Sequence, residues 1–381
     1  MTFASGPLDR LAGLPYGAAV SRERNGVDAL VVYALSRVYT FGLAIAIAVA
    51  SNATVGSILS RWDGGWYLSV VRSGYPTVLP TIAGEKSSIA FFPGYPILIR
   101  AMSAPTGLSP ILVGVAVATL SGAGASVALF RLGADLMDRS TAYRAVALFA
   151  FFPTAFVLSM VYADALFLLL AAVCLVGLVE RRWLVAGLAA GVATCVRPTG
   201  IVLVGSCLWG AVEAIRRERA WRSLVAPALA PIGLVVYVAY LRVHTGSATA
   251  FMKVANLGWG RRFDLGAWNV THALGYAREG RTVFLVAVIA VMLVGVAVGM
   301  WLLLRWRPPA AITVYVVGVV ALTVLTSHPV SLPRYVMSAF PLLIPAADRL
   351  RGRAYGLIVV GSMVLMALLF AVTSVSTRLP P

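Results

Sequence analysis

Apolar runs long enough to cross a lipid bilayer recur along the whole 381-residue chain, and they constrain its fold more than any single motif does. A helix needs about 20 apolar residues to span the hydrocarbon core of a membrane. Hydrophobic residues make up 60% of the chain and charged residues only 12%. A soluble domain of that composition would expose a largely apolar surface to water. The sequence therefore predicts an all-α, polytopic integral membrane protein.

About 11 segments are interpreted as membrane spans, and several are shorter than an untilted crossing requires. We expect residues 1–26 to form a cytoplasmic tail and residues 27–381 to form one transmembrane domain. The predicted spans are 27–50, 109–132, 145–162, 165–179, 183–196, 200–215, 224–241, 282–304, 310–327, 335–347 and 354–374.

Arginines in the short connections predict the orientation, because cytoplasmic loops are enriched in positive charge. They fall after alternate spans, at 22–24, 139–144, 181–182, 216–222, 305–307 and 349–353. This pattern puts the N-terminus in the cytoplasm and the long connections 51–108 and 242–281 on the extracytoplasmic side. The net charge of +17 is dispersed over these loops, so it indicates topology and contact with anionic lipids and no nucleic-acid partner.

The connection 51–108 is too long for a simple turn, and loops of more than about 15 residues are usually functional or carry their own structure. Its stretch 61-RWDGGWYLSVVRSGYP-76 predicts a short interfacial helix near residues 65–72. Asp63 is interpreted as a general base, or alternatively as the N-cap of that helix. The aromatic residues there are interpreted as a wall that stacks on a sugar, or as headgroup anchors.

Charged residues at the edges of other apolar runs form the second part of the predicted site, since such charges are costly in a membrane. Asp164 follows 151-FFPTAFVLSMVYA-163, and its alternative role is to cap the next helix. Arg197 precedes a proline that breaks its helix, and otherwise it snorkels to the interface. His328 and Arg334 flank a turn with two prolines, where they could clamp a substrate phosphate or contact a lipid phosphate without catalytic meaning.

Several motifs, taken in order, resemble those of the PIG-V type mannosyltransferases, which are integral membrane enzymes of the GT-C class. The resemblance is carried by 61-RWDGGWYLSVVRSGYP-76, 91-FFPGYP-96, 153-PTAFVLSMVYADALF-167, 189-AAGVATCVRPTGI-201 and 334-RYVMSAFPLL-343. In this resemblance Asp63 matches the acidic residue that GT-C enzymes use as a base. Asp164 matches a second acidic position, where the family often has Glu.

The resemblance implies a GT-C fold with an extracytoplasmic active site and a polyprenyl-phosphate-mannose donor. We expect Asp63 and Asp164 to be catalytic, and Arg334, His328 and Arg197 to bind the donor phosphate. The expected substrate-binding residues are Arg61, Trp62, Trp66, Tyr67, Tyr335, Lys253, Arg261 and Arg262. Only two lysines accompany many arginines, a bias typical of a GC-rich bacterium, so we expect a bacterial cytoplasmic membrane and a glycolipid or cell-envelope glycan as acceptor.

The expected reaction is an inverting transfer, because a sugar on a lipid phosphate already has a good leaving group and needs one base and a phosphate clamp. We expect no metal or other cofactor, since the extracytoplasmic acids are scattered and arginine can neutralise a phosphate. The three cysteines lack zinc or disulfide spacing. Two alternatives remain at this stage: a transporter or flippase of lipid-linked sugars, and a non-catalytic lipid-binding subunit.

Overall fold

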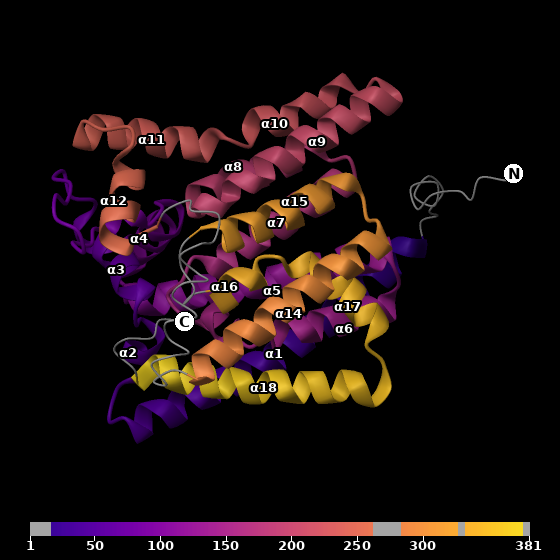
Figure 1. The fold of residues 1–381 in the computed structure, drawn as a ribbon, viewed down its shortest axis with the longest axis horizontal. Coiled ribbons are helices and arrows are strands. Elements are labelled where there is room, and N and C mark those ends of the chain that lie inside the picture. The colour runs from indigo at the N-terminus through magenta and orange to yellow at the C-terminus, as the bar shows by residue number, and fades with distance from the viewer. Residues whose placement is uncertain (1–16, 262–282, 327–331, 376–381) are drawn as a thin grey trace, which may run out of the picture.

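The computed structural model describes residues 17–261, 283–326 and 332–375, and this part of the chain is helical without a β-strand. Long helices lie side by side along one direction, and the short helices α2, α3, α4 and α12 lie at one end (Figure 1). The α9–α10, α14–α15 and α17–α18 connections, which hold predicted cytoplasmic arginines, lie at the other end (Figure 1). The all-α prediction is confirmed.

The longer helices follow the apolar runs of the sequence. They are α1 (Gly17–Ala50), α5 (Pro110–Leu136), α7 (Asp164–Val179), α8 (Trp183–Val196), α9 (Ile201–Glu218), α11 (Ile232–Thr245), α14 (Val283–Trp306), α15 (Ala310–Leu325) and α18 (Gly352–Val375). The shorter ones are α2 (Val55–Leu59), α3 (Asp63–Ser73), α4 (Gly94–Thr106), α6 (Arg139–Ala150), α10 (Val225–Leu229), α12 (Ala250–Trp259), α16 (Leu332–Met337) and α17 (Leu343–Arg349). Single 3₁₀ turns are η2 (Ser88–Ala90), η3 (Ala155–Ser159), η4 (Pro198–Gly200), η5 (Trp221–Leu224) and η6 (Phe340–Leu342).

Five stretches of the described chain are helical, long and apolar enough to cross a membrane. They are Gly26–Ala50, Pro110–Leu136, Pro198–Glu218, Trp221–Thr245 and Gly352–Val375. Three further apolar helices are shorter than a full crossing: Asp164–Val179, Trp183–Val196 and Ala310–Leu325. A fourth apolar stretch, Ala290–Trp306, is the later part of α14. The protein is therefore a multi-pass membrane protein, while the predicted number of 11 spans is not confirmed.

Three predicted spans are not continuous helices, and one of them, 224–241, passes from α10 to α11 through a turn at Ala230 and Pro231. The other two have larger interruptions. The span expected over 145–162 ends at Ala150, and the chain then continues through a buried irregular segment, residues 151–163, that contains only η3. The span expected over 335–347 is divided among α16, η6 and α17. Prolines explain both interruptions, since Pro153 and Pro341 lack the N–H that would continue a helix.

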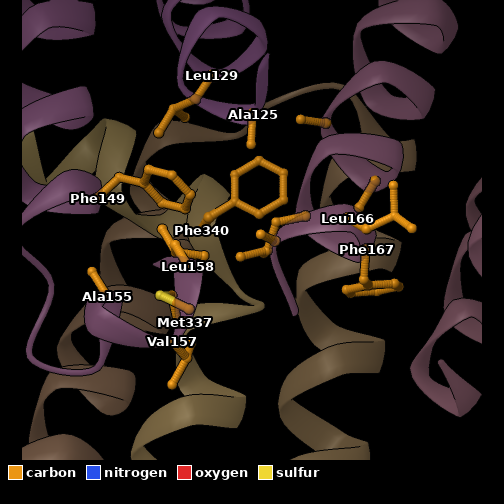
Figure 2. Packing of buried hydrophobic residues seen from close by; sticks show 14 of the residues in the cluster. Ala125, Leu129, Phe149, Ala155, Val157, Leu158, Leu166, Phe167, Met337 and Phe340 are labelled. Atoms are coloured by element: carbon orange, nitrogen blue, oxygen red, sulfur yellow. The ribbon is translucent and has the colours of Figure 1, made fainter. Parts of the chain in front are cut away.

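The irregular segment 151–163 is held in the protein core. Figure 2 shows side chains from this segment, among them Val157 and Leu158, packed near Phe167, Met337 and Phe340. Each of these five side chains is at most 2% exposed to solvent. Their burial fixes the start of α7 relative to α16, and both of these helices contribute to the candidate site.

The helix predicted near 65–72 is confirmed as α3, which packs on α4 at the end of the molecule that also holds α2 and α12 (Figure 1). Its place at a membrane interface stays a prediction. Its aromatic residues Trp66 and Tyr67 make ring contacts within the protein, and Tyr67 is buried whereas Trp66 is partly exposed. Tyr67 is 6% exposed and makes edge contacts with Phe91 and Tyr95, each at 5.2 Å between ring centroids. Trp66 stacks on Phe91 at 5.9 Å and contacts Trp259 of α12 at 5.7 Å.

Candidate active site

Asp63 is the first residue of α3 and lies 25% exposed at the edge of a cavity. The N-cap of this helix is Trp62, which makes no side-chain capping hydrogen bond. The carboxylate of Asp63 instead accepts a hydrogen bond from Arg334 Nη1 at 2.6 Å. The capping alternative for Asp63 is therefore wrong, and the carboxylate is available for an interaction across the site.

Asp164 opens α7 and is 3% exposed. It does not cap its helix either, because Ala163 occupies the N-cap position. Its carboxylate forms an ion pair with Arg197, and its second oxygen lies 3.9 Å from Arg334 Nη1. A buried carboxylate needs such partners, since an unpaired charge away from water is strongly destabilising.

Arg197 lies at the break between α8 and η4, with an extended backbone that ends α8 before Pro198. The turn is tight: a Cβ on Gly200 would come within 2.7 Å of the Ala193 carbonyl oxygen, so glycine is required there. The side chain of Arg197 is only 8% exposed, which contradicts the snorkelling alternative. The helix break thus directs this guanidinium inward, toward Asp164.

Arg334 joins the two acidic residues from α16, and it is 4% exposed. Its guanidinium also lies 5.1 Å from the ring centroid of Tyr162 and 5.3 Å from that of Tyr335. Burial alone would lower the pKa of Arg334, but Asp63 and Asp164 raise it well above its usual value. Arg334 therefore stays cationic, as a phosphate-binding group must.

A cavity of about 480 Å³ opens beside these charges, within the range typical of small-molecule sites. Asp63, Asp164, Arg197 and Arg334 all contribute to its wall. The rest of the lining is mainly apolar and aromatic, and comprises Tyr67, Ala90, Phe91, Phe92, Val196, Pro198, Thr199, Ile201, Phe251, Met252, Ala255, Arg261, Leu322, Thr323, Thr326 and Tyr335.

A third cation, Arg261, reaches the cavity from the residues that follow α12 and hydrogen-bonds the hydroxyl of Tyr335. The ring of Tyr335 lies between guanidinium groups, with Arg197 and Arg261 each 5.6 Å from its centroid. Burial would raise the pKa of this phenol, yet Arg261, Arg334 and Arg197 together lower it. The site therefore combines carboxylates with a strongly positive field, which suits an anionic group placed next to a hydroxyl nucleophile.

Comparison with known families identifies the chain. A sequence profile described as Mannosyltransferase (PIG-V) matches residues 28–226, which is more than half of the chain. The protein belongs to the PIG-V mannosyltransferase family. The family expected from the motifs is thus confirmed, and the matched region holds Asp63, Asp164 and Arg197, whereas Arg334 lies beyond it. No curated protein sequence matches the chain.

Among solved structures, the PIG-V chain resembles ArnT from Cupriavidus metallidurans, a GT-C glycosyltransferase determined with bound undecaprenyl phosphate. The TM-score is 0.58 at 18% identity, and the match covers 91% of this chain. The chain spans 65% of the length of that structure. At this identity the likeness concerns the fold, and it supports the predicted GT-C architecture.

Only some of the other predicted substrate-binding residues line the cavity. Tyr67 and Tyr335 line the cavity, whereas Trp62, Trp66, Arg61 and Lys253 are not part of its wall. The indole of Trp62 donates to the Thr373 carbonyl of α18 at 2.8 Å. Lys253 is exposed on α12. The predicted residues Arg262 and His328 lie outside the described residues.

Sequence reasoning missed the cavity-lining residues of α12, namely Phe251, Met252 and Ala255. A periodic signal covers Ala255, which shares one buried helical face with Ala250, Val254 and Gly258, whereas Phe251 and Met252 lie outside that buried set. The missed residues Leu322, Thr323 and Thr326 of the α15 region offer no such signal, since that helix is apolar all round.

Proposed function

We propose that this protein is an inverting mannosyltransferase that moves mannose from polyprenyl-phosphate-mannose to a hydroxyl of a glycolipid or cell-envelope glycan. One observation carries the proposal: Asp63 and the buried Arg334 meet at 2.6 Å on the wall of one cavity, although 271 residues separate them. A base and a phosphate-binding cation are the two groups that this reaction needs within one site. Membership of a mannosyltransferase family supports the choice of sugar.

In the proposed step, an acceptor hydroxyl oxygen attacks the anomeric carbon while the bond from that carbon to the phosphate oxygen breaks. Asp63 takes the hydroxyl proton, and the bonding electron pair leaves with the polyprenyl phosphate. A positioned general base contributes about 10²- to 10⁴-fold to such a reaction. Attack opposite the leaving phosphate inverts the anomeric centre, so a β-linked donor gives an α-mannoside.

Arg334 and Arg197 would stabilise the charge that grows on the departing phosphate, with Arg261 as a third cation. Donors already aimed at developing charge usually provide the largest catalytic contribution. Asp164 would hold both arginines, since it pairs with Arg197 and lies 3.9 Å from Arg334 Nη1. We propose that the reaction needs no metal ion, because these guanidinium groups can neutralise the phosphate.

The exposed edge of the cavity suggests a route for the donor lipid. Ile201 at the start of α9 is 43% exposed and Met252 of α12 is 68% exposed, and both line the cavity together with Leu322. We propose that the polyprenyl chain extends into the bilayer past these apolar side chains. The active site then lies at the extracytoplasmic face of a bacterial cytoplasmic membrane, with the N-terminus in the cytoplasm.

The test is sugar transfer by the purified protein from synthetic polyprenyl-phosphate-mannose to a membrane lipid extract, with excess chelator. Wild type is expected to transfer mannose, and Asp63→Asn to lose about 10²- to 10⁴-fold in turnover. Asp348→Asn is the matched control, because among the described residues that carboxylate forms an ion pair with the exposed Arg351 and lies outside the cavity lining.

Three outcomes would contradict parts of the proposal. Wild-type turnover in folded Asp63→Asn would remove the base assignment. Activity that disappears with chelator and returns with a divalent cation would remove metal independence. Transfer from a different polyprenyl-phosphate sugar, with none from the mannosyl donor, would replace mannose while leaving the base and the phosphate clamp in place.

A further inference from the structure

The turn that presents Asp63 has an unusual backbone. Trp62, the residue before it, has φ of 59° and ψ of −116°, a conformation that a bulky L-residue rarely adopts. Strained residues of this kind persist only where the surrounding structure holds them, and they concentrate at functional sites. The conformation of Trp62 determines where the carboxylate of Asp63 points, so the groups that hold it bear on catalysis.

One hydroxyl group bonds to the peptide units on both sides of Trp62. The Tyr162 hydroxyl accepts a hydrogen bond from the Asp63 N–H at 3.4 Å and donates one to the Arg61 carbonyl at 3.3 Å. These two contacts connect the strained turn to the segment just before Asp164. The Trp62 indole adds a separate anchor through the Thr373 carbonyl.

Tyr162 is itself fixed in the core and is completely buried. The residue before it, Val161, donates its N–H to the Leu59 carbonyl at 2.8 Å. A Cβ on Gly64 would meet the Val161 carbonyl oxygen at 3.3 Å, so the two segments also touch on the other side of the turn. The ring of Tyr162 therefore has little freedom to move, and it lies 5.1 Å from the guanidinium of Arg334.

We propose that Tyr162 is a positioning residue with two separable parts, a hydroxyl that orients Asp63 and a ring that supports Arg334. The inference rests on the proposed function, because it assigns Asp63 as the base and Arg334 as the phosphate-binding group. Neither the family match nor the likeness to ArnT assigns a role to this tyrosine. Its contacts divide between catalysis and donor binding, so different variants are expected to affect different kinetic constants.

The experiment measures kcat, the KM for the donor and the melting temperature of purified Tyr162→Phe and Tyr162→Leu. Tyr162→Phe keeps the ring and loses the hydroxyl, so kcat is expected to fall about 10- to 100-fold while the donor KM stays unchanged; a misplacement near 1 Å has such an effect. Tyr162→Leu also loses the ring, so it should raise the donor KM as well. Tyr237→Phe is the control, since that buried hydroxyl donates to the Ile89 carbonyl at 2.7 Å, away from Asp63.

A double variant distinguishes positioning from general stability. In the Asp63→Asn background, Tyr162→Phe is expected to cause no further loss of the residual turnover, because the base that it orients is already absent. An unchanged kcat in Tyr162→Phe would overturn the proposal, and so would equal losses in both backgrounds accompanied by a lower melting temperature. If Asp63→Asn itself transfers mannose at the wild-type rate, the proposed function fails first, which distinguishes the two failures.

Discussion

Two buried arginines, Arg37 and Arg334, are each 4% exposed, yet they bind different kinds of partner. Arg37, in α1, donates to the main-chain carbonyls of Ala155 at 2.8 Å and Ala150 at 3.0 Å, and to the Ser159 hydroxyl at 3.1 Å. These groups belong to the irregular segment 151–163 and to the end of the helix before it. Arg37 therefore satisfies carbonyls that a continuous helix would have bonded internally.

Arg334 has carboxylates as partners and lines the cavity of the candidate site. Among the described residues, Arg37 forms no ion pair with a carboxylate and does not line that cavity. A charge satisfied by neutral main-chain groups in a packed core stabilises the fold. A charge that faces carboxylates across an open cavity can change partner when an anionic ligand arrives. Burial of a charged side chain therefore does not by itself indicate function, whereas its partners and the space beside it do.

The largest expected effect is on catalysis at the cavity. Arg334→Gln removes the cation that we propose to lie next to the leaving phosphate, and loss of one such preorganised donor typically costs about 10²- to 10³-fold in turnover. The measurement is kcat and donor KM in the mannose-transfer assay, with Arg351→Gln as a control on an exposed ion pair. Unchanged kcat and donor KM in Arg334→Gln would end the phosphate-clamp assignment.

Arg37→Leu should change stability instead of chemistry. It leaves the Ala150 and Ala155 carbonyls without their donor, and each buried unsatisfied group costs about 1–3 kcal/mol. We expect a clearly lower melting temperature in detergent, with turnover per folded molecule within a few-fold of wild type. If the variant melts normally but has lost mannose transfer, Arg37 has a functional role like the one proposed for Arg334, and the distinction between the two arginines is wrong.

The smallest effect is expected for the cation at the edge of the cavity. Arg261→Gln should raise the donor KM by about 10-fold, since a charge-assisted hydrogen bond contributes about 1.5–3 kcal/mol before solvent screening reduces it. Lys253→Gln is the matched control, because Lys253 is exposed on the adjoining α12 and does not line the cavity. Equal changes in the two variants would show that only the general positive field matters.

Two helix starts show how far local sequence can be trusted. Asp138 immediately precedes α6 and caps it, accepting from the Thr141 N–H at 2.9 Å. Asp164 instead pairs with Arg197, which is 33 residues away along the chain. Capping is decided within one helical turn, so it can be read from sequence, but the alternative role of Asp164 depends on a partner brought close only by folding.

The helical, membrane-spanning character of the protein could be predicted from the sequence, because mean hydropathy is a property of contiguous residues. The sequence also identified Asp63, Asp164, Arg197 and Arg334, since a charge beside an apolar run is costly wherever the chain folds. Only the tertiary structure shows that these four residues share one cavity and that α12 helps to enclose it. It also shows that the Tyr162 hydroxyl contacts the turn before Asp63. The physical reason is that hydrogen bonds and ion pairs between distant segments depend on angstrom-scale distances, which no local pattern of residues encodes.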